Sequence, residues 1–294
     1  MIRVLKIKQQ GLGAALAVFS GLPYRITMSD RFEPKKSLGQ HFLNSDYVPK
    51  KLCDAADVNV GERVLEIGPG TGMLTKELLK RGANVIALEA DRRAIIELEE
   101  TFLCEITSGQ LTVIHHDVRT LDPAMFGLAP GNYKVVANIP YYLSGFLFRT
   151  LLESAAPPST LVFLVQKEVA TRIARDKKES LLSLSIKLFG TPTYICTIAK
   201  SHFTPPPRID SAIIAVREIK ANRYTGLNYQ GFFEILHLGF GSKRKQLASN
   251  LSAKFDKTQV VHKLSDLGLT ATVRAEDISL SNWVQLAIHL QSPD

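Results

Sequence analysis

The chain has 294 residues, of which 45% are hydrophobic and 22% charged, as expected for a globular protein with a sizeable core. Its formal net charge of +8 favours a polyanionic partner, with nucleic acid ahead of an anionic membrane surface. The three cysteines share no metal-ligand spacing, so we expect reduced thiols, a cytoplasmic location and no metal site.

The first 28 residues form a basic segment without acidic side chains. Its apolar run, Leu12 to Phe19, is far too short to span a bilayer, and no other segment approaches a transmembrane helix, so we expect no membrane partner. Two explanations stay open: a signal or organelle transit peptide, which would make the protein organellar, or translated sequence upstream of a start at Met28. We expect residues 1–34 to be a dispensable or disordered extension, because a functional signal begins only at Lys35.

Helical and strand-like patterns alternate from residue 45 onward. The expected strands cover 62–68, 84–90, 111–117, 134–140 and 160–166, with a last edge strand at 211–219. The expected helices cover 45–58, 73–82, 91–103, 145–154 and 167–175. This alternation predicts a doubly wound α/β fold, in which helices cover both faces of a mostly parallel sheet.

Only helical patterns remain after about Lys220. They cover 229–240, 243–252, 257–269 and 281–291. We therefore expect an α/β domain over residues 35–220 and a small all-helical domain over residues 221–294.

A glycine-rich turn follows the first expected strand. In "EIGPGTG", Gly68, Gly70 and Gly72 allow a ligand to approach the backbone and the next helix N-terminus closely. Glu89 ends the second strand, where its carboxylate can bind ribose hydroxyls. This pattern suits a nicotinamide dinucleotide as well as S-adenosylmethionine.

Two further carboxylates favour S-adenosylmethionine as the cofactor. Glu66 precedes the glycines, where a dinucleotide site usually has an apolar residue, and Pro69 shortens the loop. Asp117 ends the third strand, where it can accept a hydrogen bond from an adenine amino group. Each carboxylate alone is equally well explained as a solvated loop residue. Their common register with the glycine turn, at the carboxyl ends of strands, favours a binding site.

The fourth strand ends in Asn138-Ile139-Pro140-Tyr141, beside the expected position of the methyl donor. The Asn138 side-chain oxygen and the Pro140 carbonyl can each accept one N–H of an adenine amine, whose lone pair is otherwise delocalised into the ring. Tyr141 can stack on the base, a contact of roughly 1–3 kcal/mol. These residues predict catalysis by positioning and electrostatics without a general base. A strand that merely ends in a proline turn with two buried tyrosines is the alternative.

Five motifs in order along the chain resemble the ribosomal RNA adenine N6-dimethyltransferase family. They are "KKSLGQHFL", "EIGPGTG", "NIPYYLS", "LVFLVQKEVATRI" and "FTPPPRIDSAI", and the match continues through "GFGSKRKQLASNL". Within the family, the likeness is to the small-subunit dimethyltransferases, which modify two adjacent adenosines near the 3′ end of that RNA. The resemblance implies a Rossmann-like class I S-adenosylmethionine-dependent methyltransferase domain followed by a helical RNA-docking domain, with a role in small-subunit biogenesis.

The resemblance also assigns roles to individual residues. The expected donor-binding residues are His41, Leu43, Glu66, Gly68, Gly70, Glu89, Asp117 and Asn138. The family often has Asn where this chain has His41, so the resemblance supports the side-chain contact of His41 less strongly than the other contacts of the set. The expected catalytic residues are Asn138, Pro140, Tyr141 and Phe203, because Phe203 resembles the aromatic residue that stacks on the target base opposite Tyr141.

Basic side chains suit the RNA role that the resemblance implies. The residues expected to contact phosphates are Lys35, Lys36, Arg172, Lys243, Arg244 and Lys245. The last three cluster at the start of an expected helix, while Arg172 lies one turn from Arg175. A solvated surface charge is the alternative for each one. The expected partner is small-subunit ribosomal RNA in a pre-ribosomal particle, recognised through its folded shape by a monomer.

Three other functions stay open at this level. The first is an antibiotic-resistance enzyme of the same fold that methylates one adenosine of large-subunit RNA. The second is an organellar member of the small-subunit branch. The third is a non-catalytic assembly or transcription factor that keeps the fold, although such a binder has no need of Glu89 or of the Asn138–Tyr141 motif.

Overall fold

The structure is a computed structural model that describes residues 41–291 of the chain. Residues 1–40 and 292–294 lie outside this part, so the predictions for the N-terminal extension and for Lys35 and Lys36 fall outside the described residues. Within residues 41–291, no helix is long and apolar enough to cross a bilayer.

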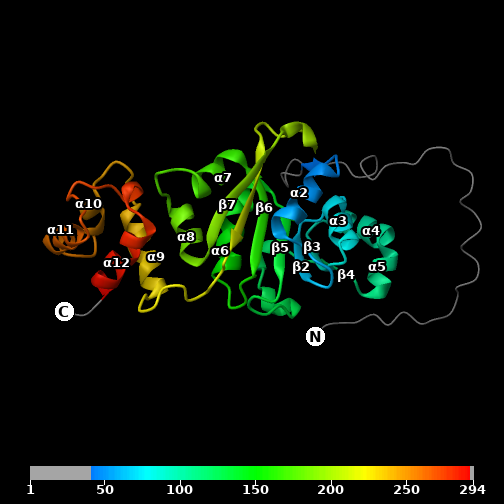
Figure 1. Ribbon diagram of the computed structural model, residues 1–294, viewed down its shortest axis with the longest axis horizontal. Helices are drawn as coiled ribbons and strands as arrows, with labels where there is room; N and C mark the ends of the chain where they lie inside the picture. The colour runs from blue at the N-terminus through cyan, green and yellow to red at the C-terminus, as the bar shows by residue number, and fades with distance from the viewer. Residues whose placement is uncertain (1–40, 292–294) are drawn as a thin grey trace, which may run out of the picture. The chain divides into compact units, whose positions relative to one another are not determined.

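A seven-stranded sheet forms the centre of the described residues, with the strand order β4-β3-β2-β5-β6-β9-β7 (Figure 1). The strands are β2 (Arg63–Ile67), β3 (Asn84–Glu89), β4 (Leu111–His115), β5 (Lys134–Asn138), β6 (Thr160–Gln166), β7 (Thr191–Ile198) and β9 (Ser211–Arg217). Strands β2 to β6 are parallel to one another, and β9 is antiparallel to both of its neighbours. The order reverses between β2 and β5, and ligands of open α/β sheets bind at this reversal, beyond the carboxyl ends of the strands.

The prediction that the last strand lies at the sheet edge is wrong. Strand β9 pairs with β6 on one side and with β7 on the other, and β7 forms the edge. Residues 211–216 are all buried, which explains why "SAIIAV" is an almost unbroken run of small and apolar residues. Because β9 runs antiparallel, its first residue, Ser211, pairs with Gln166 at the carboxyl end of β6.

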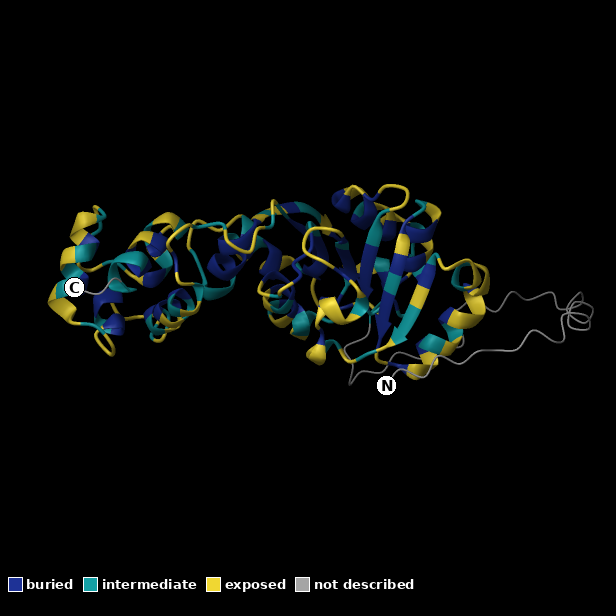
Figure 2. Cartoon of the chain, turned by 90° about the horizontal axis from the view of Figure 1, so that it is seen from below, coloured by how far each residue is buried: buried dark blue, intermediate teal, exposed yellow. Residues whose placement is uncertain are grey.

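Alternate residues of each strand face opposite sides of the sheet, as the pleat requires. Val64 and Val136 belong to the cluster under α2, α3 and α4, whereas Leu65 and Val135 belong to the cluster under α6, α7 and α8. The helices are α2 (Tyr47–Ala56), α3 (Met73–Lys80), α4 (Arg92–Thr101), α5 (Leu103–Ser108), α6 (Ser144–Leu152), α7 (Lys167–Ala174) and α8 (Leu181–Phe189). Buried residues line the inner surfaces of these elements and exposed residues lie outside (Figure 2).

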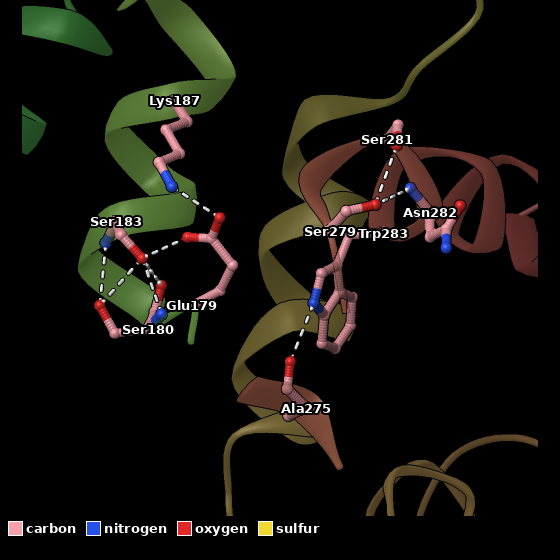
Figure 3. A network of polar contacts seen from close by, with 9 residues as sticks. All are labelled: Glu179, Ser180, Ser183, Lys187, Ala275, Ser279, Ser281, Asn282 and Trp283. Carbon is pink, nitrogen blue, oxygen red and sulfur yellow. Dashed lines mark hydrogen bonds and ion pairs between the residues drawn. The ribbon is translucent and has the colours of Figure 1, made fainter. Parts of the chain in front are cut away.

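Four helices follow the sheet: α9 (Tyr229–Gly239), α10 (Leu247–Leu251), α11 (Lys257–Asp266) and α12 (Leu280–Gln291). They pack around Trp283, whose side chain is fully buried. The Trp283 indole N–H donates to the carbonyl oxygen of Ala275 at 3.3 Å (Figure 3), and its ring stacks on Phe240 with the centroids 5.8 Å apart. Trp283 thereby joins the beginning of α12 to the end of α9.

The C-terminal helices share a hydrophobic cluster with the sheet. Phe189, at the end of α8, stacks on Tyr229 and Phe233 of α9, with centroids 5.6 and 6.2 Å apart. Before α8, the Glu179 N–H donates to the carbonyl oxygen of Glu276 at 2.8 Å. The Glu179 carboxylate accepts from Lys187 at 2.6 Å, beside the Ser180 cap of α8 (Figure 3). The division into separate domains at residues 220 and 221 stays a prediction.

Candidate active site

A pocket of about 350 Å³ opens at the carboxyl ends of β2, β3 and β5. Most of the residues that the sequence singled out line it: His41, Leu43, Glu66, Gly68, Gly70, Glu89, Asp117, Asn138, Pro140 and Tyr141. The structure therefore brings together the whole expected donor-binding set and three of the four expected catalytic residues.

The glycine turn is required both by its backbone conformation and by crowding. Gly70 and Gly72 have φ angles of 55° and 76°, in the left-handed region that disfavours other residues. A β-carbon on Gly72 would lie 2.6 Å from the Phe102 ring, and one on Gly70 would lie 3.1 Å from the Phe42 ring. The turn thus passes close under two aromatic rings before α3 begins.

Glu89 is held by main-chain donors. Its Oε1 accepts from the N–H groups of Ala90 and Asp91, each at 2.8 Å, and its Oε2 accepts from Gly70 N–H at 3.2 Å. Burial raises the pKa of Glu89, although these three hydrogen bonds act in the opposite direction. Since Oε2 has a single partner, it keeps a lone pair for a ligand hydroxyl.

Glu66 is a buried carboxyl group at the bottom of the pocket, with 1% of its surface exposed. The Thr75 hydroxyl donates to its Oε2 at 2.7 Å, while its Oε1 has no hydrogen-bond partner within the described chain. Burial raises the pKa of Glu66 to about 8, the charge of Glu89 adds to the rise, and the Thr75 hydrogen bond opposes it. A buried acceptor without a partner is costly, so this oxygen marks a place for a donor group of a ligand.

Asp117 lies in the loop after β4 and caps the short helix Val118–Thr120. Arg119, which the sequence analysis did not single out, donates from Nε at 3.0 Å and from Nη2 at 2.5 Å to the Asp117 carboxylate. These bonds lower the pKa of Asp117 to about 2. The Asp117 and Arg119 side chains are 45% and 75% exposed, so solvent weakens the ion pair and a ligand can compete for the carboxylate.

The Asn138 amide is oriented by the backbone of the first motif. Its Nδ2 donates to the His41 carbonyl oxygen at 3.3 Å, and its Oδ1 accepts no hydrogen bond from residues 41–291. Oδ1 therefore offers an acceptor in the pocket. The Pro140 carbonyl accepts from Leu143 N–H at 3.0 Å and keeps a second lone pair.

Tyr141 is fastened at both its ring and its hydroxyl group. The hydroxyl lies 2.7 Å from Ser211 Oγ, and the ring stacks on His41 with the centroids 5.9 Å apart and 23° between the planes. Burial raises the pKa of the Tyr141 phenol. The His41 ring is positioned in turn by a 2.8 Å contact between its Nδ1, as donor, and the Pro205 carbonyl oxygen.

Phe203 does not line this pocket. It pairs with Leu43 in a small two-stranded sheet formed by β1 (Phe42–Leu43) and β8 (Phe203–Thr204), and it is only 2% exposed. Its ring packs in the core with Val48 and Ile198. The expected stacking of Phe203 on a target base does not match this position, because the buried ring has no free face.

Four of the expected RNA-binding residues, Arg172 and residues 243–245, are among the described ones, and they lie outside the pocket. Arg172 is exposed on α7, and the Arg175 guanidinium lies 3.6 Å above the centroid of the Tyr194 ring. Residues 243–245 are exposed in a turn, because α10 begins only at Leu247, so their expected place at the start of a helix is wrong. The buried Asn250 side chain holds this turn by donating to the carbonyl oxygens of Gly239 and Ser242 at 2.6 and 3.1 Å.

Sequence comparison agrees with this geometry. The sequence model of the family described as ribosomal RNA adenine dimethylase matches residues 31–292. The chain belongs to this family. The ribosomal RNA small subunit methyltransferase A of Dehalococcoides mccartyi is 37% identical over 257 residues, which cover 86% of this chain and 87% of that protein. The protein of the same name from Thermosynechococcus vestitus is 37% identical over 262 residues, covering 86% and 95%.

Solved structures of methyltransferases share the fold of this dimethylase. A dimethyladenosine transferase from Plasmodium falciparum is 27% identical, with a TM-score of 0.71 over 84% of this chain and 96% of that one. The 23S rRNA methyltransferase ErmE has a TM-score of 0.68 over 85% and 100%, and its 23% identity shows a common fold alone. The predicted fold class, a Rossmann-like methyltransferase domain with a helical C-terminal region, is confirmed.

The pocket also fits S-adenosylmethionine, the cofactor of this class of enzyme. The molecule combines positive groups with a ribose and an adenine, and the pocket offers the carboxylates of Glu66, Glu89 and Asp117. The Glu66 oxygen without a partner becomes an acceptor when a cationic ligand group favours the ionised carboxylate, and the Glu89 lone pair accepts from a ligand hydroxyl group. The chain is an S-adenosylmethionine-dependent ribosomal RNA methyltransferase, which confirms the predicted cofactor and enzyme class.

Proposed function

We propose that this dimethylase transfers methyl groups to N6 of two adjacent adenosines near the 3′ end of small-subunit ribosomal RNA. The product is N6,N6-dimethyladenosine at both positions, which requires two transfers to each base. The family match and the relatives named small subunit methyltransferase A support this substrate. The modification serves small-subunit biogenesis.

S-adenosylmethionine supplies a methyl group made electrophilic by the adjacent sulfonium. We assign its binding to the carboxylates of Glu66, Glu89 and Asp117, with the Gly68 and Gly70 turn allowing close approach. The side chain of Leu43 and the ring of His41 complete the same wall. These residues bind and orient the donor.

The target adenine is held by hydrogen-bond acceptors for its exocyclic N6 amine. Asn138 Oδ1 and the Pro140 carbonyl oxygen each accept one N–H of the target N6, which withdraws its lone pair from conjugation with the ring and aims it. Tyr141, fastened by Ser211, supports the base. No general base is needed, because the methylated nitrogen is cationic and loses its proton readily to water.

One observation carries this assignment. One N–H of the Asn138 side-chain amide donates to the His41 carbonyl oxygen, which orients the amide and leaves its Oδ1 as an acceptor in the pocket. An oxygen acceptor recognises an exocyclic amine and rejects a carbonyl in the same place. The arrangement therefore selects adenine over uracil or guanine at the reacting edge.

The partner is a pre-ribosomal particle in the cytoplasm, bound by one copy of the chain. We assign phosphate contacts to Arg172 and to the exposed turn at residues 243–245, and the same role to Lys35 and Lys36 beyond the described part. Replacing the three basic residues of the turn by Ala lowers affinity for the particle and reduces the salt dependence of binding, with kcat unchanged. Light scattering of the pure protein measures its molar mass in solution, and a value near 32.5 kDa is expected for a monomer.

The decisive experiment is methyl transfer from labelled S-adenosylmethionine to small subunits that lack this modification. Digested RNA is analysed for N6,N6-dimethyladenosine, with the Asn138→Ala variant as the control. Two methyl groups on each of two adenosines, absent with the variant, establish the reaction.

Other outcomes reassign the protein. Transfer to naked large-subunit RNA, with none to small subunits, identifies a resistance-type enzyme. Tight binding to small subunits without any transfer identifies a non-catalytic assembly factor. Cleavage of residues 1–28 on import places the same reaction in an organelle.

A further inference from the structure

Tyr142 stands at the mouth of the pocket with its side chain in solvent. It follows Tyr141 in the short 3₁₀ helix Tyr141–Leu143, where successive side chains diverge by about 120°. Tyr141 is therefore held inward by Ser211, whereas Tyr142 is 65% exposed and still lines the pocket. The two neighbouring rings serve different sides of the same opening.

The Tyr142 ring makes no aromatic contact and its hydroxyl no hydrogen bond within residues 41–291. Single exposed aromatic residues are common on proteins, so exposure alone says little. Three features set this one apart. It lines the reaction pocket, it shares that lining with the exposed Arg119 guanidinium, and it is followed one turn later by the 40% exposed Phe146.

The proposed substrate supplies the occupant of this surface. Two adjacent adenosines are modified, and the pocket is built around one reacting amine, held by Asn138 and Pro140. The neighbouring base is covalently tied to the one inside, so it lies at the mouth during each transfer. An exposed aromatic ring with a positive charge beside it is the combination that binds single-stranded RNA by stacking and phosphate attraction.

Resting on the proposed function, we propose that Tyr142 is the stacking platform for the adenosine adjacent to the one in the pocket. Arg119 contributes positive charge toward the phosphate that joins the two nucleotides. Tyr142 thereby positions the pair so that each base enters the pocket while the other is held outside. It is a positioning residue for the RNA and makes no contribution to donor binding.

The first test compares Tyr142→Ala with Tyr142→Phe in the full chain. The Ala variant lowers kcat/KM for unmodified small subunits by about 5- to 150-fold, as the loss of one base stack of about 1–3 kcal/mol predicts, and the Phe variant stays near wild type. The Kd for S-adenosylmethionine, measured by calorimetry, is unchanged in both. Leu103→Ala is the matched control, because Leu103 is 63% exposed on α5 and lies outside the pocket.

A thermodynamic cycle decides whether the neighbouring base is the partner. Small subunits are assembled on RNA in which one of the two adenosines is replaced by an abasic nucleotide, and methylation of the other is measured. The abasic change lowers kcat/KM for the wild type and has little further effect on Tyr142→Ala, since both changes remove one contact.

Equal effects of the abasic change in both proteins would overturn the proposal, as would a Phe variant as impaired as Ala. These results are distinct from failure of the proposed function, in which the wild-type protein itself transfers no methyl group to intact small subunits.

Discussion

The two halves of the active-site pocket are held in different ways. The donor half consists of Glu66, Gly68, Gly70 and Glu89, and the base half of Asn138, Pro140, Tyr141 and Tyr142. In the donor half, Glu66 and Glu89 are buried, and three main-chain N–H groups from nearby residues hold the Glu89 carboxylate. The base half is held by bonds to distant segments, from Asn138 to the His41 carbonyl and from Tyr141 to Ser211, and it ends in an exposed ring.

This difference matches the two ligands. A small donor of constant shape is bound by a cavity that is formed before it arrives, with buried acceptors waiting for its polar groups. The RNA base arrives from a large particle and needs an entrance, so the residues that receive it reach the surface. We expect the two halves to respond separately to substitution, with effects that decrease in the order Asn138, Gly72, Glu66, His41.

Asn138→Ala acts on the base half. Loss of a pre-oriented acceptor lowers kcat by about 10²–10³-fold, because the target amine is no longer aimed at the methyl group. Loss of one hydrogen bond changes the Kd for the donor by no more than about tenfold. Single-turnover kinetics and calorimetry measure the two quantities, with Asn132→Ala, at an exposed position, as the control. If the Asn138→Ala variant binds the donor much more weakly but keeps the wild-type kcat, Asn138 acts in donor binding, and the separation of the two halves is wrong.

Gly72→Ala acts on the glycine turn that follows the donor half and leads into α3. It combines a positive φ with a β-carbon 2.6 Å from the Phe102 ring, so the free energy of unfolding falls by about 2–3 kcal/mol. Gly109→Ala is the matched control, since Gly109 has a φ of 80° and no atom within 4 Å of the added carbon. It loses only the conformational part, about 1 kcal/mol. Denaturant unfolding measures the free energy of unfolding of both variants. Equal decreases would show that the Phe102 ring moves aside without an energetic cost.

Glu66→Gln tests the buried carboxyl group through pH. The folded-state pKa of about 8 lies above the ordinary 4.5, so between these values the folded protein holds a proton that the unfolded chain has released. Glu66 therefore makes the free energy of unfolding fall as pH rises, by at most about 1.4 kcal/mol per pH unit. The stability of the Gln variant relative to wild type rises from pH 5 toward pH 8. Unfolding curves measured between pH 5 and pH 8 give the difference in free energy of unfolding between the Gln variant and wild type. A difference that does not change with pH would contradict the raised pKa of Glu66.

His41→Ala has the smallest expected effect. The Asn138 amide is oriented by the His41 backbone carbonyl, which every side chain at this position retains. The variant loses only the stack on Tyr141 and the bond to Pro205, so kcat/KM falls by about 2- to 12-fold, as for one hydrogen bond. His41→Asn lies between Ala and wild type if its amide N–H reaches Pro205. If His41→Ala loses as much activity as Asn138→Ala, the imidazole ring of His41 has a direct catalytic role.

Local patterns predicted the strands that carry the site, because β2, β3 and β5 are short, largely apolar runs followed by a glycine turn or closed by Glu89 or Asn138. Two neighbouring elements escaped detection. Helix α8 contains "LLSLSIKLF", whose alternation of Leu and Ser resembles a strand, and its amphipathic packing is visible only in three dimensions. Strand β7 contains Pro192, which suits an edge strand and weakens its pattern.

Contacts between segments that are distant in the chain could not be predicted from the sequence. The Asn138–His41 and Tyr141–Ser211 hydrogen bonds join residues that are 97 and 70 positions apart, and no spacing rule reveals them. The burial of Phe203 has the same origin, because its strand pairs with β1 from the other end of the domain. The pairing of Arg119 with Asp117 could have been predicted from the sequence, because a cationic side chain two residues after an exposed aspartate can reach its carboxylate.

The reversed direction of β9 decides which loop borders the active-site pocket. An antiparallel strand begins at the edge where its parallel neighbours end, so the segment before it, residues 199–210, is delivered to the base half. The donor half is built from β2 and β3, on the far side of β5. The same segment also supports the donor wall, because Phe203 and Thr204 pair with Leu43 and Phe42 and Pro205 holds the His41 ring. One loop therefore couples the place where the methyl donor sits to the entrance that receives the RNA.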